Sequence, residues 1–422
     1  MQFIEEGTTA MNDDRFFQKA ISRRSILKMA GAAAGSAALY GLAPAMATAA
    51  PAPSGSFPVE YRELPKGGMK LSTVGIGAGN LRYTSPEEIE RVVALALDHG
   101  INFMDMLLPN GPFPEIETLA RSIRSRRDQV VTQMHLGALF RNGQYTRSRN
   151  VRLIQDEIEQ QLDMFGGYFD IGLLHYVDQE DDFEEIMNDG MFAYAQRLQK
   201  DGKVRSLGFS THSVNIARKF METGAFDIYL FSINPAYDFD SSGGHLAYSR
   251  ERAELYQETA RRGVGIVCMK TYGGGRLLDE RTSPFGRAMT PAQCIQYALD
   301  RPAVLSCPVG VSGVSEMQSA IDYYSSSREE RNYGFIGTLQ DKDVAGSCVY
   351  CNHCLPCPAN IDIGAAMKYY DLALAGDEFA KDHYRKLSKT AADCIYCGRC
   401  EPNCPFHVGI MDTMRKMTAF FA

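Results

Sequence analysis

The chain has 422 residues, of which 45% are hydrophobic and 23% charged, values typical of a globular protein large enough for a big domain and a small one. The formal net charge of −7 gives no electrostatic support to a nucleic-acid-binding role. Cysteine is distributed unevenly, because most of the 11 cysteines fall between residues 348 and 404. Tight cysteine clusters of this kind indicate metal ligation rather than a disulfide framework.

The N-terminal segment has the pattern of an export signal. Residues 22–28 read Ser-Arg-Arg-Ser-Ile-Leu-Lys, and an Ala/Gly-rich stretch with small-x-small sites follows. This resembles a twin-arginine (Tat) signal peptide in which Arg23 and Arg24 are the recognised pair. It predicts a signal over 1–50, a linker over 51–57 and a folded protein exported to the periplasm or another extracytoplasmic compartment. Glycines and a proline break the apolar stretch, so no stable membrane span is expected after signal removal. A basic helix start is the alternative.

The middle of the chain alternates short apolar runs with amphipathic helical patterns. Eight such βα units in roughly 260 residues predict an α/β fold, a (β/α)₈ TIM barrel. Helix starts are expected at Ser85-Pro86 and Thr290-Pro291. A doubly wound open sheet is less well supported, since no Gly-x-Gly-x-x-Gly follows the first run. The predicted strands are residues 73–77, 102–105, 129–135, 169–175, 204–210, 227–233, 265–270 and 304–309.

Polar residues stand where these strands end. In a barrel of this type the chemistry lies at the carboxyl ends of the strands, so these residues are the first functional candidates. They are Asp105, His135, His175, Ser210, Asn234 and Lys270.

Several phrases around these strand ends resemble the aldo-keto reductase family. They include Gly100-Ile-Asn-Phe-Met-Asp105, Phe169-Asp-Ile-Gly-Leu-Leu-His175 and Gly202-Lys-Val-Arg-Ser-Leu-Gly-Phe-Ser210. The resemblance extends over about residues 58–325, and the barrel domain is placed at 58–335. A subgroup of this family carries a Tat signal and a C-terminal segment with two iron–sulfur clusters.

The family's catalytic set is an Asp, a Tyr, a Lys and a His. Asp105 and His175 match the Asp and the His, but Asn110 stands where the Tyr is expected and His135 stands near the place of the Lys. The resemblance implies that Asp105 orients or pairs charge and that His175 acts as acid, base or oxyanion partner. His135 is a candidate second proton donor because imidazole titrates near neutral pH. Asn110 can donate a hydrogen bond but cannot deliver a proton.

The family uses NADP(H), and the residues expected to bind it are partly changed. Ser210 matches, Thr211 replaces an Asn, and Leu230 stands where a Gln is usual. Lys270 and Gly310 complete the candidate cofactor-binding residues. The resemblance therefore implies a nicotinamide site, while the substitutions make NADP(H) use doubtful.

Two runs of four cysteines lie near the carboxyl end, and each run ends in Cys-Pro. The second run has the spacing of bacterial ferredoxins and the first is one residue shorter. They predict two [4Fe–4S] clusters in a small ferredoxin-like domain over 336–422, with zinc as the alternative. By analogy, Cys404 completes the cluster of the first run and Cys357 that of the second. The ligands are Cys348, Cys351, Cys354, Cys357, Cys394, Cys397, Cys400 and Cys404.

The favoured function is an exported iron–sulfur oxidoreductase acting on a small carbonyl-type substrate, with a redox protein or quinone-linked partner for its electrons. An NADPH-dependent carbonyl reductase and a non-catalytic electron-transfer subunit are the alternatives. A metal ion held by Asp105, His135 and His175 is a further hypothesis. The acidic stretch Asp178–Asp189 reads as a solvated helix start.

Overall fold

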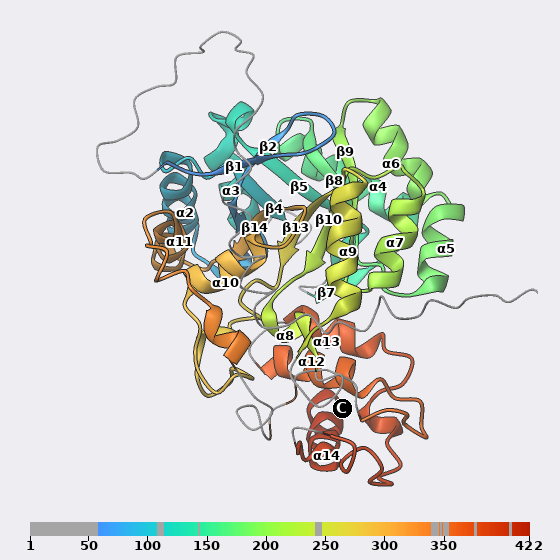
Figure 1. Ribbon diagram of the computed structural model, residues 1–422. Coiled ribbons are helices and arrows are strands. Elements are labelled where there is room, and N and C mark those ends of the chain that lie inside the picture. Colours follow the sequence, from blue (N-terminus) through green and yellow to red (C-terminus); the bar gives the residue numbers. More distant parts are fainter. Residues whose placement is uncertain are drawn as a thin grey trace, which may run out of the picture. The chain divides into compact units, whose positions relative to one another are not determined.

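The computed structural model describes residues 58–107, 114–141, 144–240, 247–338, 346, 348, 354–374, 378–404 and 407–422. Eight parallel strands close into a barrel in the order β3-β4-β5-β8-β9-β10-β13-β14 and back to β3 (Figure 1). The prediction of a (β/α)₈ barrel is therefore confirmed, and each predicted strand lies within about two residues of an observed one. The strands are β3 (Val74–Gly77), β4 (Phe103–Met106), β5 (Val131–Leu136), β8 (Phe169–Leu174), β9 (Val204–Thr211), β10 (Ile228–Ser232), β13 (Gly265–Met269) and β14 (Val304–Gly310).

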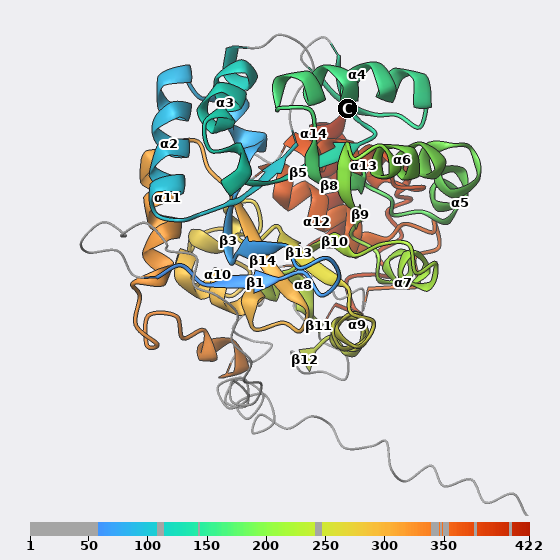
Figure 2. The same ribbon diagram turned by 90° about the horizontal axis from the view of Figure 1, so that it is seen from above.

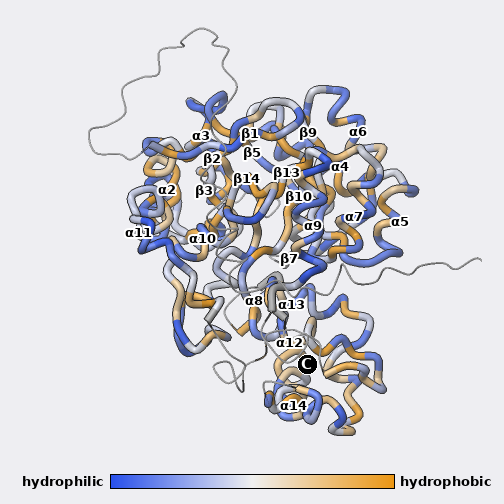
Figure 3. Tube along the Cα trace, viewed as in Figure 1, coloured by the Kyte–Doolittle hydropathy of each residue, from blue (hydrophilic) through white to orange (hydrophobic). Residues whose placement is uncertain are grey.

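The interior of the barrel is a packed apolar core rather than a channel. An antiparallel hairpin, β1 (Tyr61–Glu63) and β2 (Lys70–Ser72), supplies Leu64 and Leu71 to it. Leu230, which stands where the family has a Gln, is 4% exposed within the same cluster. Figure 3 shows hydrophobic residues recurring along the strands. Because side chains fill the barrel at the amino ends of the strands, a substrate site is expected only at their carboxyl ends.

Helices form a ring around the strands (Figure 2). At α2 the Ser85 side chain accepts from the Glu88 backbone N–H, and at α10 Thr290 and Gln293 form a capping box, so both predicted helix starts are confirmed. The ring contains α2 (Pro86–Asp98), α3 (Pro114–Arg124), α4 (Val151–Met164), α5 (Glu180–Asn188), α6 (Met191–Lys200), α7 (Val214–Glu222), α9 (Arg250–Arg261), α10 (Pro291–Leu299) and α11 (Val314–Ile321).

Three shorter insertions were not predicted from the sequence. Two are small hairpins: β6 (Ala138–Arg141) with β7 (Gln144–Arg147), and β11 (Phe239–Asp240) with β12 (Ala247–Tyr248). The third is α8 (Pro235–Asp238), which begins at Asn234. All three follow barrel strands, so they extend the edge of the barrel where the candidate residues lie.

The C-terminal segment contributes α12 (Ile363–Leu374), α13 (Glu378–Arg385) and α14 (Ile410–Phe421). The first two lie between the two cysteine runs. Residues 50–422 form one compact unit, and α12 and α13 lie near α8 at the carboxyl ends of the barrel strands (Figure 1). No helix among the described residues is long and apolar enough to cross a membrane. The predicted signal and linker, residues 1–57, lie outside the described residues.

Strands β9 and β10 approach closely at Gly208, and this contact provides a test of the barrel. A Cβ atom at Gly208 would lie 2.5 Å from the Ile228 carbonyl oxygen and 2.5 Å from Cδ2 of Leu173. We expect Gly208→Ala to lower the free energy of unfolding by about 1–3 kcal/mol, because backbone cannot move aside as a side chain can. Guanidinium unfolding under anaerobic conditions measures it. The control is Gly337→Ala, where nothing lies within 4 Å of the added atom; equal loss in both variants would contradict the register.

Candidate functional site

Three sequence-predicted residues meet in one hydrogen-bonded chain at the mouth of the barrel. Asp105 lies one residue before the end of β4, His135 lies near the end of β5, and His175 follows β8 directly. Nε2 of His135 lies 2.7 Å from Oδ1 of Asp105, and Nδ1 of His135 lies 3.0 Å from Nδ1 of His175. Adjacent parallel strands bring these side chains together although 70 residues of chain separate the first from the last.

The hydrogen-bonding capacities of these groups assign their protons. An ionised Asp105 carboxylate only accepts, so Nε2 of His135 donates to it, and neutral His135 then accepts at Nδ1 from Nδ1–H of His175. Burial lowers the pKa of His175 well below its usual value, and the neighbouring charges of His135 and Arg149 act in the same direction. His175 is therefore neutral near neutral pH. The three groups form a path along which a proton can move between buried His175 and the partly exposed carboxylate.

The sequence suggested a metal ion bound by Asp105, His135 and His175. In the structure both ring nitrogens of His135 are engaged in hydrogen bonds to the other two residues. Among the described residues these three do not form a group with metal-ligand geometry. The described arrangement is a hydrogen-bonded chain and gives no support to a metal ion at this position.

The candidate cofactor residues lie around the same mouth. The Ser210 hydroxyl accepts from the Tyr176 backbone N–H at 2.7 Å, and Thr211 donates to Asp178 at 2.9 Å. Lys270 adopts a left-handed backbone conformation after β13, with φ of 64°. Gly310 ends β14, and a Cβ there would lie 2.9 Å from the Asn80 amide nitrogen. The described geometry ties the Ser210 and Thr211 side chains into the protein itself. Asn110 lies outside the described residues.

Aromatic rings from the C-terminal segment cover part of this mouth. The His383 ring of α13 lies 4.0 Å from the ring of Tyr176, the residue after His175, and 4.6 Å from that of His212. Tyr369 of α12 stacks on His383 at 5.4 Å. Tyr176 is 4% exposed and His383 is 7% exposed. The strand ends of β8 and β9 are therefore shielded from solvent by the segment that carries the cysteines.

The acidic stretch after β8 is only in part the solvated helix start that the sequence indicated. α5 begins at Glu180, and Glu180 and Asp181 are exposed, but Asp178 and Asp182 are not. The side chain of Asp178 is 12% exposed and accepts from Nδ1 of His212 at 2.9 Å. Asp182 is buried and bridges Arg147 at 2.6 Å and Arg149 at 2.7 Å. The arginines come from β7 and the loop after it, which the sequence did not predict. Two acidic residues of the stretch therefore serve the mouth of the barrel.

Sequence reasoning missed His212 and His383. His212 directly follows β9, so the rule that picked out His175 applies to it equally. No comparable signal marks His383, because it lies in the middle of a short helix some 170 residues further along the chain. Only the tertiary contact with α13 brings it to the barrel.

Cysteines of both runs line one hollow in the C-terminal segment. They are Cys354 and Cys357 of the first run with Cys394, Cys397 and Cys400 of the second, so the hollow alone does not sort the ligands between two clusters. Its other walls are apolar and include Ile363, Ile395 and Met414. The Tyr396 backbone N–H lies 3.4 Å from Sγ of Cys394, a contact that supports a thiolate ligand. Several thiols around an apolar hollow fit the chemistry of a [4Fe–4S] cluster.

The first cluster's candidates are only partly described. Cys354 and Cys404 are each 8% exposed, Cys348 is half-buried, and Cys351 lies outside the described residues. The sorting of Cys354 and Cys404 into one cluster stays a prediction. The remaining cysteines, Cys268, Cys294 and Cys307, are at most 1% exposed and pack as small hydrophobic residues in the barrel.

A buried ion pair links the C-terminal segment to the barrel. Nη1 of Arg276, in the loop after β13, lies 2.9 Å from Oδ2 of Asp371 on α12. Burial raises the pKa of Asp371 to about 6, and Arg276 lowers it only in part. This carboxylate therefore titrates where most aspartates are fully ionised.

Comparison with known protein families and structures identifies both parts of the chain. Residues 66–304 match the aldo/keto reductase family, and residues 347–409 match the 4Fe-4S dicluster domain. The chain is similar in fold to aldo-keto reductase AKR11C1 from Bacillus halodurans in its holo form, at 16% identity and a TM-score of 0.54 over 66% of this chain and 96% of that one. A putative aldo-keto reductase from Pseudomonas aeruginosa matches at 17% identity and a TM-score of 0.49, over 64% of this chain and 96% of that one. No curated protein matches the chain in sequence.

An eight-stranded barrel with its polar residues at the carboxyl ends of the strands, followed by a ferredoxin-type segment, defines an iron–sulfur oxidoreductase. The family match covers more than half of the chain, and the chain belongs to the aldo/keto reductase family. NADP is the typical cofactor of that family. The C-terminal match extends over all eight predicted cluster ligands.

Removing one cysteine of the hollow tests the ligand assignment. We expect Cys397→Ala to lower the iron content of anaerobically prepared protein from about eight to about four per chain, because one of two clusters loses a ligand. Iron and sulfide analysis measures it. Cys294→Ala is the control, since that thiol is buried in the barrel. Equal iron content in Cys397→Ala and the unaltered protein would contradict the assignment.

The Asp371 carboxylate predicts a pH dependence of stability. Its folded-state pKa of about 6 exceeds the ordinary value of 3.8, so the folded state holds a proton that the unfolded state has already lost. The free energy of unfolding should therefore fall as pH rises from about 4 to about 6, by a total of about 3 kcal/mol at most. Urea unfolding at pH values from about 4 to about 7 samples this window.

Asp371→Asn should flatten this part of the pH profile because amides do not titrate. Asp412→Asn is the matched control, since Asp412 pairs with Lys416 on the surface of α14. An unchanged slope in Asp371→Asn would show that another group is responsible.

Proposed function

We propose that this chain reduces or oxidises a small carbonyl-type substrate at the mouth of its barrel, with electrons carried by two [4Fe–4S] clusters. The observation that carries the proposal is the buried chain Asp105–His135–His175. It ends beside the segment that holds the cysteines, because Tyr176 packs on His383. A proton path and an electron-carrying domain thus meet at one place.

Because the family's catalytic Tyr and Lys are replaced in this chain, Asp105, His135 and His175 are left to supply the proton. Interconversion of a carbonyl and an alcohol moves two electrons and two protons. In other members of the family a tyrosine delivers the proton. Asn110 stands in its place here and cannot deliver one, because an amide does not ionise. The imidazoles of His135 and His175 can deliver a proton, and Asp105 stabilises the cation that forms on His135 when a proton enters the chain. Each cluster, when bound, exchanges one electron at a time, so two clusters match the two electrons of one carbonyl.

Two observations support electrons from the clusters rather than hydride from NADPH. The side chains of Ser210 and Thr211 are engaged with Tyr176 and Asp178 inside the protein. The strand ends of β8 and β9 lie under α12 and α13. The donor is then a redox protein or a quinone-linked partner, and the Tat-type segment with Arg23 and Arg24 favours an extracytoplasmic site of action, where free nicotinamide is scarce.

Replacement of the carboxylate at the outer end of the proton path tests the proposal. We expect Asp105→Asn to lower kcat with a viologen donor and small aldehydes or ketones by roughly 10²–10⁴-fold, the usual contribution of positioned acid–base groups. The amide no longer stabilises a charged His135. Anaerobic assays of viologen oxidation measure it.

Asp98→Asn is the matched control, because Asp98 forms an exposed ion pair with Arg126. Iron content confirms that both variants keep their clusters. Unaltered kcat in Asp105→Asn would remove this path from the mechanism, and turnover with NADPH alone would favour the family's usual chemistry.

A further inference from the structure

Two buried imidazole nitrogens lie where α13 meets the barrel, and neither finds a hydrogen-bond partner among the described residues. They are Nε2 of His212 and Nδ1 of His383. The side chain of His212 is 6% exposed, and His383 is 7% exposed. Burying a polar atom without a partner is unfavourable. Two such atoms on neighbouring rings, whose centres are 4.6 Å apart, indicate that a bound ligand supplies the partner.

The carboxylate of Asp178 fixes which nitrogen of His212 is available. Oδ2 of Asp178 accepts from Nδ1 of His212 at 2.9 Å, while Oδ1 accepts from the His212 backbone N–H at 2.6 Å and from Thr211 at 2.9 Å. A carboxylate only accepts hydrogen bonds, so Nδ1 of His212 carries the proton and Nε2 of the neutral ring presents a lone pair. Metal-binding histidines are commonly oriented by a carboxylate in this way.

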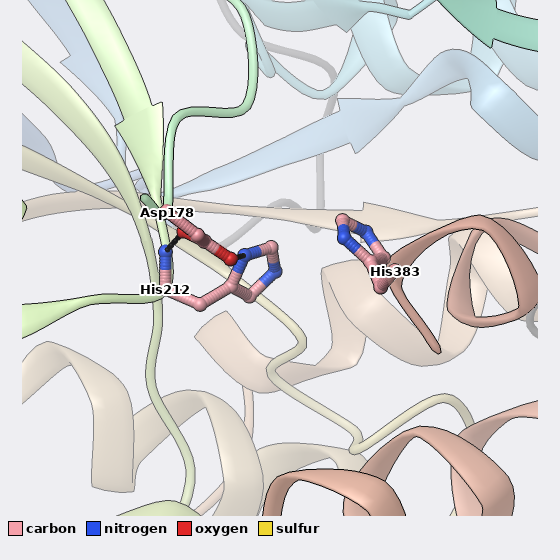
Figure 4. A group of neighbouring side chains, drawn as sticks. All are labelled: Asp178, His212 and His383. Atoms are coloured by element: carbon pink, nitrogen blue, oxygen red, sulfur yellow. Dashed lines mark hydrogen bonds and ion pairs between the residues drawn. The ribbon is translucent and has the colours of Figure 1, made fainter. Parts of the chain in front are cut away.

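The His383 ring brings a second imidazole to this position. One ligand-type atom from each of Asp178, His212 and His383 lies within 4.8 Å of the others. Figure 4 shows the His383 ring on its helix, facing the Asp178–His212 pair. We infer that His212 and His383 bind one divalent first-row metal ion of the kind that prefers imidazole, such as Zn²⁺, while Asp178 orients His212 from the other side of its ring.

The charges around the three residues narrow the kind of ion. Besides burial, the positive charges of Lys270 and Lys368 act on His212, and those of Lys270 and Lys386 act on His383. These ammonium groups oppose ions held mainly by charge, such as Mg²⁺ and Ca²⁺, which also require several oxygen donors. An imidazole-preferring ion tolerates them, and the lysines favour a negatively charged group as a further ligand.

The site is distinct from the two features already described. It shares no residue with the Asp105–His135–His175 chain or with the cysteines. His212 belongs to the end of β9 and His383 to α13, so a bound ion would join the barrel to the C-terminal segment. The inference does not depend on how electrons reach the substrate.

Metal titration of the complete protein tests the inference. Protein with both clusters loaded, at about eight irons per chain, is titrated with Zn²⁺ and with Co²⁺, followed by desalting and elemental analysis. We expect one added ion per chain, nitrogen and oxygen ligands at the cobalt X-ray absorption edge, and a higher melting temperature. Mg²⁺ should give none of these.

Variants assign the ion to these residues. His383→Gln and His212→Gln should each abolish retention through desalting, and Asp178→Asn should weaken binding about 10–100-fold, since it orients His212. His99→Gln is the control, because the His99 ring bonds to the Leu95 carbonyl on α2, away from the mouth.

Three results would overturn the inference. They are an unaltered protein that retains no ion, sulfur ligands at the cobalt edge, and full retention by His383→Gln. The first would mean that a buried water joins the two imidazoles instead. If a histidine variant fails to load its clusters, the titration of the unaltered protein decides the question.

Discussion

The packing of the His383 ring among Tyr176, His212 and Tyr369 determines what can happen at the mouth of this barrel. Without it, the cysteine-bearing segment would be joined to the barrel by the chain and by edge contacts such as Arg276–Asp371. With it, the strand ends of β8 and β9 are buried, and the imidazoles there lose most of their tendency to become charged. Neutral imidazoles accept protons or bind metal ions, whereas charged ones do neither. One aromatic contact thus links the shape of the mouth to its chemistry.

The short segment after β8 connects the features of the site. His175 ends the proton path, Tyr176 packs on the C-terminal segment, and Asp178 orients His212. Since these residues are nearly consecutive, a displacement of α13 would shift both the Asp105–His135–His175 chain and the Asp178–His212 pair. The absence of the family's tyrosine is consistent with the proposal that residues of these neighbouring strands supply the proton.

Much of the fold and part of the site could be predicted from the sequence. Barrel strands are local, strongly apolar and followed by helices, so residues such as Asp105, His135 and His175 could be placed at strand ends before any coordinates. The spacing of Cys394, Cys397 and Cys400 likewise predicts a cluster site, because two-residue gaps let the thiols of one loop reach the same cluster. Asp178, His212 and His383 could not be joined in this way, because their contact depends on how α13 packs on the barrel. The burial of Asp182 within the acidic stretch could not be predicted for the same reason, because the arginines that pair with it come from an insertion with no clear sequence pattern.

The most direct measurement of the central claim is anaerobic stopped-flow spectroscopy of the reduced protein. Protein reduced at both clusters and freed of excess reductant is mixed with a carbonyl compound that it turns over, and cluster absorbance and alcohol product are followed together. The account predicts that the clusters are reoxidised at the rate of product formation, with one alcohol for each pair of cluster electrons. Clusters that stay reduced while alcohol forms only on addition of NADPH would contradict it.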